Sequence, residues 1–62
     1  ISMTKEALEA MAHKGKVAGN ERCVHYAKAG MKALTQGRDV DAYAYLDKAR
    51  YEFITSIEEL PF

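Results

Sequence analysis

Two reactive side chains, a thiol and an imidazole, lie close together in the 62-residue chain. A cysteine thiolate beside a histidine base is a pair that nucleophilic catalysis uses. Cys23 and His25 are two positions apart, however, and side chains at that spacing on a helix point in different directions. Cys23 belongs to the apolar side of its predicted helix, so we predict a structural thiol rather than a nucleophile.

Metal binding would require further ligands at suitable spacing. His13 stands alone, and the sequence contains no CxxC or HxxxH pattern. The acidic pairs occupy predicted helix ends, where carboxylates serve as caps or interact with solvent rather than form an acid–base pair. These are Asp39 with Asp41 and Glu58 with Glu59. We therefore predict a protein that is not an enzyme and that binds no metal and no cofactor.

The length allows one domain, and its single cysteine excludes an internal disulfide. A lone cysteine fits a reducing, cytoplasmic location better than a secreted one. No apolar run approaches the roughly 18 residues of a membrane span, and no signal peptide is visible. Ile1 and Ser2 before Met3 have the character of a cloning remnant. A core of this size supplies only about 3–5 kcal/mol, so self-association is the expected additional source of stability.

Two amphipathic segments organise the chain, and we expect helices at about 20–36 and 39–59. Asn20 suits the N-cap of the first, and Gly37 suits the positive φ that ends it. Asp39 is expected to cap the second. Residues that share the apolar arc of 20–36 are Cys23, Val24, Tyr26, Ala27, Gly30, Met31, Ala33 and Leu34. The corresponding stripe of 39–59, continued past its end, is Ala42, Leu46, Ala49, Phe53, Ile57 and Leu60, with Tyr45 at its edge.

Small residues on both stripes allow the two helices to pack closely. Gly30 and Ala33 lie on one, Ala42 and Ala49 on the other, and the short connection implies antiparallel neighbours. The sequence therefore predicts an all-α, three-helix unit built on an antiparallel hairpin. Residues 1–62 form this single domain.

A first helix is expected at about 4–15, capped by Thr4. Its predicted buried face is narrow and rich in alanine: Met3, Ala7, Met11 and Ala18, flanked by Leu8. Gly15 and Gly19 weaken its far end, so we expect it to be the most mobile element. Pro61 prevents extension at the other end of the chain.

The hairpin resembles a tetratricopeptide helix pair. Positions that reproduce the separations of that family are Tyr26, Gly30, Gly37, Ala42, Leu46 and Ala49. The segment Glu6-Ala7-Leu8-Glu9 resembles part of the preceding repeat, which gives about one and a half repeats. Departures are Ala33 in place of a large aromatic, Ala29 in place of leucine and Ile54 in place of proline. The resemblance implies a protein-binding solenoid unit, and such units need about three repeats to bury their faces.

The last helix carries more apolar surface than one neighbour can cover. The residues off its main stripe are Val40, Tyr43, Ala44, Tyr51 and Ile54, with Glu58 at one end. Either the first helix covers some of them or they form a contact surface for another chain. We favour a small protein–protein interaction module, an adaptor or regulator that also forms a homodimer. The small size alone is typical of bacterial or phage accessory proteins that modulate a host protein.

Charge is unevenly distributed although the net charge is zero. The chain up to Arg38 has seven basic and three acidic residues, and the remainder has six acidic and two basic ones. Such asymmetry either steers association or gives only solvated outer faces. The alternative function is a small nucleic-acid-binding regulator that uses Arg22, Lys28 and Lys32 on the outside of its helix. The neutral net charge argues against it.

Overall fold

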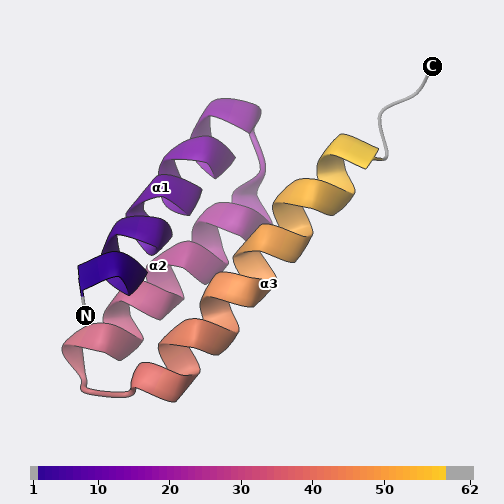
Figure 1. Ribbon diagram of the computed structural model, residues 1–62. Coiled ribbons are helices and arrows are strands. Elements are labelled where there is room, and N and C mark those ends of the chain that lie inside the picture. Colours follow the sequence, from indigo (N-terminus) through magenta and orange to yellow (C-terminus); the bar gives the residue numbers. More distant parts are fainter. Residues whose placement is uncertain (1, 59–62) are drawn as a thin grey trace.

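Three helices account for nearly all of the described chain. The computed structural model describes residues 2–58, and the side chains of residues 4–56. The helices are α1 (Ser2–Ala18), α2 (Glu21–Thr35) and α3 (Asp39–Glu58), and the chain reverses direction at each of the two turns (Figure 1). The prediction of an all-α three-helix unit is confirmed. Predictions made for Ile1, Glu59, Leu60, Pro61 and Phe62 lie outside the described residues.

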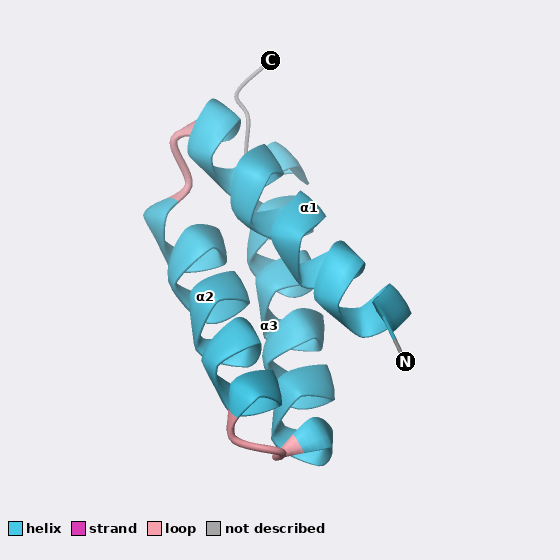
Figure 2. Ribbon diagram, turned by 90° about the vertical axis from the view of Figure 1, so that its left-hand side faces the viewer, coloured by secondary structure: helices cyan, strands magenta, loops and turns pink. Residues whose placement is uncertain are grey.

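The α2–α3 hairpin has the packing that its small residues predict. Ala42 and Ala49 on α3 are fully buried, and Gly30 and Ala33 on α2 are also buried. α2 and α3 lie antiparallel and side by side in both views (Figures 1 and 2). Because these residues add so little bulk, the two backbones approach closely along their length. The buried hydrophobic residues of the whole unit are Leu8, Met11, Cys23, Ala27, Ala33, Ala42, Leu46 and Ala49.

Both turns use the same glycine-based helix ending. Gly19 and Gly37 have positive φ values of 72° and 74°. After α2, the Arg38 amide donates to the Ala33 carbonyl at 2.9 Å and the Gly37 amide donates to the Leu34 carbonyl at 3.0 Å. The ending of α1 repeats this pair of bonds, so each glycine closes its helix with a Schellman motif.

The N-terminus of α2 is capped as predicted. Asn20 Oδ1 accepts the Cys23 amide at 3.0 Å, which satisfies one of the free donors of the first turn. α3 begins differently from the prediction. Asp39 lies in the first turn, and the residue before it, Arg38, occupies the cap position because its carbonyl accepts the Ala42 amide at 3.0 Å. The prediction that Asp39 caps this helix was one residue too late.

α1 is longer than predicted, and its buried face overlaps the predicted one: Leu8 and Met11 are buried and Ala7 packs against the core. The helix extends to Ala18 rather than to about residue 15, and Ala18 itself is exposed. The buried line is Thr4, Leu8, Met11 and Gly15. Gly15 lies inside the helix and faces α2. A Cβ at this position would be 3.0 Å from the Cβ and Sγ of Cys23, so the absence of a side chain allows the two helices to pack closely here. Thr4 is buried within the helix instead of capping it.

None of the three helices, over the part of the chain that is described, has the length and apolar character needed to cross a membrane.

Candidate protein interface

α3 carries apolar side chains on two opposite sides. One side, centred on Ala42, Leu46 and Ala49, is buried against α1 and α2. The other side holds four large apolar residues that are more than half exposed: Val40 at 81%, Tyr43 at 56%, Tyr51 at 68% and Ile54 at 53%. Ala44 is exposed on the same side. We call the exposed surface of Val40, Tyr43, Ala44, Asp47, Arg50, Tyr51 and Ile54 the outer face of α3.

The arrangement of the helices leaves this outer face uncovered. Figure 1 shows α1 and α2 on one side of α3, with no helix of the described chain on its other side. All residues of the outer face are exposed, so α1 leaves most of this surface open. α1 packs instead on the inner side, where Leu8 meets Gly30 of α2. The side chain of Glu58, which was predicted to end the contact surface, lies outside the described side chains.

Two charged residues lie within the outer face and were not among its predicted members. Asp47 and Arg50 are exposed and fall between Tyr43 and Ile54 along the helix. Of the described side chains, the ion pair that does form joins Arg38 to Asp41, with Nε to Oδ2 at 2.8 Å. Asp47 and Arg50 thus present opposite charges to solvent in the middle of an apolar surface.

An aromatic pair borders the outer face on the side of α2. The rings of Tyr26 and Tyr45 are stacked, with centroids 6.4 Å apart and planes inclined by 27°. The Lys48 ammonium lies 5.7 Å from the first ring centroid and 5.8 Å from the second. Next to this cluster is a shallow depression of about 430 Å³ lined by Tyr26, Asp47, Lys48, Tyr51 and Glu52. The depression is largely apolar and opens directly beside the outer face.

The residues considered for chemistry are separated in space. Cys23 is fully buried and its Sγ donates to the Met11 carbonyl at 3.5 Å. Burial, reinforced by the negative charge of Glu52, raises the pKa of the Cys23 thiol. His25 is exposed and its ring lies roughly edge-to-face with that of Tyr26, with centroids 5.7 Å apart, whereas the thiol is buried. Within the described residues no three His, Cys, Asp or Glu side chains gather in a way that would hold a metal ion.

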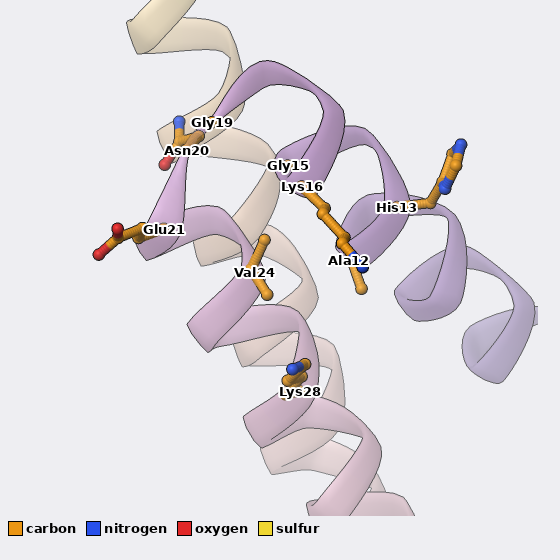
Figure 3. Close-up of a pocket in the computed structure, with 9 residues that line it drawn as sticks. All are labelled: Ala12, His13, Gly15, Lys16, Gly19, Asn20, Glu21, Val24 and Lys28. Carbon is orange, nitrogen blue, oxygen red and sulfur yellow. The ribbon is translucent and has the colours of Figure 1, made fainter.

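A second surface feature is a groove of about 590 Å³ between the end of α1 and the start of α2 (Figure 3). Its lining residues include Lys16, Val24 and Lys28. Figure 3 shows His13 and Glu21 pointing in opposite directions, away from the middle of the groove. The polar side chains of this groove do not converge on a common point, as a binding pocket for a small molecule requires.

The basic residues of the alternative interface are all exposed on α2: Arg22, Lys28 and Lys32. Arg38 forms an ion pair with Asp41 and lines a shallow depression together with Lys28 and Lys32. Lys16 of α1 lines the groove of Figure 3 together with Lys28, so the basic residues lie on the outside of α2 and at the end of α1.

No protein-family model, curated protein or solved structure matches this chain. The fold and the site together define a small all-α three-helix unit with one uncovered apolar helix face.

Proposed function

We propose that this chain is a cytoplasmic, non-enzymatic protein–protein interaction module, an adaptor or regulator, that binds through the outer face of α3. The observation that carries the proposal is the exposure of four large apolar side chains on one side of one helix: Val40, Tyr43, Tyr51 and Ile54. Isolated apolar residues on a surface need no explanation, whereas a contiguous group is typical of a contact site.

The composition of the outer face supports a protein as the ligand. Two of its four large members, Tyr43 and Tyr51, are tyrosines, which are enriched in the central parts of protein interfaces. Burial of apolar surface contributes about 25 cal/mol per Å² removed from water, and a rigid helix loses little entropy on binding. The shallow depression beside Tyr51 offers space for a side chain of the bound protein.

We also propose a likeness to a tetratricopeptide unit, which rests on the spacing of the small residues of the hairpin. Gly30, Ala42 and Ala49 are buried between the helices, and Leu8 of α1 packs on Gly30. A unit of one and a half repeats leaves the outside of its last helix uncovered. In longer solenoids, the next repeat covers that surface.

Site-specific photo-crosslinking in cells tests the function. A photoreactive amino acid replaces Tyr51 on the outer face, and in a control it replaces Lys32 on the outside of α2. We expect protein adducts from position 51 and far fewer from position 32. An absence of protein adducts at position 51, in a chain that retains its helicity, would overturn the proposal.

The control position also examines nucleic-acid binding. If the basic residues of α2 contact nucleic acid, position 32 will crosslink to it, and mixed duplex DNA will bind at low salt with strong salt dependence. The variant Lys28→Glu/Lys32→Glu would then abolish binding. We expect neither adduct nor binding, because the acidic residues on α3 repel phosphates.

A further inference from the structure

The outer face of α3 contains a regular seam that its exposed residues define. Val40, Tyr43, Asp47, Arg50 and Ile54 follow one another at steps of three, four, three and four. This is the spacing by which one helix packs along another in a coiled coil. All five residues are exposed, so the seam is free over its described length of about four turns. A seam of this kind fits an α-helix as its occupant.

The two charges of the seam determine which helix fits. Asp47 and Arg50 are consecutive seam residues of opposite sign. If a second α3 lay parallel and in register, aspartate would face aspartate and arginine would face arginine. If it lay antiparallel, Asp47 would face Arg50 of the second copy, and by symmetry the reverse pair would form as well. Like charges placed directly opposite each other are unfavourable, so the antiparallel arrangement is preferred.

The same antiparallel register aligns the apolar residues. When position 47 lies opposite position 50, position 43 lies opposite position 54, since each pair of numbers has the same sum. Tyr43 therefore faces Ile54 of the second copy, and Ile54 faces its Tyr43. A single register thus places opposite charges together and also places the large apolar residues together. Tyr51 lies beside this contact, next to the shallow depression.

We propose that the occupant of the outer face is a second copy of this chain. The two α3 helices lie antiparallel about a two-fold axis, with Asp47 opposite Arg50 and Tyr43 opposite Ile54 across the interface. The proposal rests on the proposed function and names its partner. A two-fold contact uses the same surface on both copies and closes on itself. Pairing of the acidic α3 with the basic side of α2 in another copy would instead be open-ended.

Charge exchange tests the register. Sedimentation velocity from micromolar to millimolar concentration is measured for the wild type, Asp47→Arg, Arg50→Asp and the double variant. We expect the wild type to form dimers and each single variant to dissociate at least tenfold more readily, because it places like charges opposite each other. The double variant restores Arg–Asp pairs and should dimerise within about threefold of the wild type. Lys28→Glu, on α2, is the matched control and should leave dimerisation unchanged.

A direct measurement locates the contact if a charge-reversed variant loses its helicity. In the conservative variant Arg50→Lys, a carbodiimide can join the Asp47 carboxylate to the new amine of the second copy. We expect the dimer band to contain a peptide linked between positions 47 and 50. A dimer band without that link would overturn the register.

Other outcomes separate this proposal from the proposed function. A wild type that stays monomeric at millimolar concentration would overturn self-association, while adducts of position 51 with other proteins would leave the interaction function intact. A double variant as weak as the single ones would exclude the antiparallel register. Stronger association of Arg50→Asp would point to open-ended pairing with the basic side of α2 and would also overturn the proposal.

Discussion

The side chain of Leu8 on α1 lies directly over the backbone of Gly30 on α2. A Cβ at Gly30 would be 2.5 Å from Leu8 Cδ2, and 3.2 Å from the Cβ of Tyr45 on α3. All three helices therefore meet around a single missing side chain. Leu8 is completely buried, so any shift of its branched end must be taken up inside the core.

Replacement of Gly30 by alanine should destabilise the protein. Alanine is the better helix former by about 1 kcal/mol, but overpacking of a filled core costs about 1–3 kcal/mol. We expect a net loss, visible as a lower midpoint in urea unfolding followed by circular dichroism. A double-mutant cycle with Leu8→Ala supplies the control, because Gly30→Ala should cost less once the leucine is removed. Equal cost in both backgrounds would show that the Leu8 contact is not the cause.

Asn20→Ala should lower stability by about 1–3 kcal/mol, since it removes a helix cap and a second hydrogen bond. The second bond runs from Asn20 Nδ2 to the Glu52 carbonyl of α3 at 3.0 Å. Asn20→Asp is the matched control, because it keeps an oxygen for the Cys23 amide and loses only the donor to α3. The difference in stability between the two variants, measured by thermal unfolding, gives the contribution of the helix cap. Identical losses would mean that the cap contributes nothing.

Gly37→Ala should cost about 1–2 kcal/mol through backbone strain alone. Its φ is +74°, and nothing lies within 4 Å of a Cβ placed there. A chain of 62 residues is accessible to chemical synthesis, so D-alanine can be introduced at the same position. D-Alanine prefers positive φ and should raise stability by about 0.4–1 kcal/mol by restricting the unfolded chain. Destabilisation by both enantiomers would point to a steric clash instead of strain.

The pH dependence of stability should reveal the buried thiol. Because the pKa of Cys23 is raised in the folded state, the unfolded chain loses this proton first as the pH rises. The folded state then binds more protons, so stability falls as the pH increases above about 8.5, the ordinary thiol range. Cys23→Ala should remove this part of the decline. Urea unfolding of both proteins between pH 7 and 10 gives the free energy of unfolding at each pH. If this free energy falls equally with pH in the wild type and in Cys23→Ala, the prediction is contradicted.

Local signals made the hairpin predictable. The cap at Asn20 and the positive φ at Gly37 depend on residues only a few positions away, and the apolar stripes of α2 and α3 are broad. α1 was harder because alanine occupies several of its sides, so its pattern does not fix which side faces inward. The sequence predicts only that Gly15 weakens the end of its helix. Its actual role depends on Cys23, a tertiary neighbour that helix periodicity does not reveal.

The outer face was predictable only in part. Its apolar residues stand out because they lie opposite the core stripe of α3, and their exposure follows from the placement of α1. Asp47 and Arg50 do not stand out in the sequence, because exposed charges on a helix are usually solvated. Their place in a contact surface depends on the exposure of Tyr43 and Ile54 beside them, which the sequence alone does not establish.

Asn20 makes a hydrogen bond to each of the three helices. Its amide reaches Gly15 of α1, its side-chain oxygen reaches Cys23 of α2, and its side-chain nitrogen reaches Glu52 of α3. The opposite end of the bundle has no comparable residue among those described, and Gly37 there closes only its own turn. One residue therefore links all three helices by hydrogen bonds at one end of the bundle. A chain break introduced at Gly37 would leave these three hydrogen bonds in place, whereas a break at Asn20 would disturb all three at once.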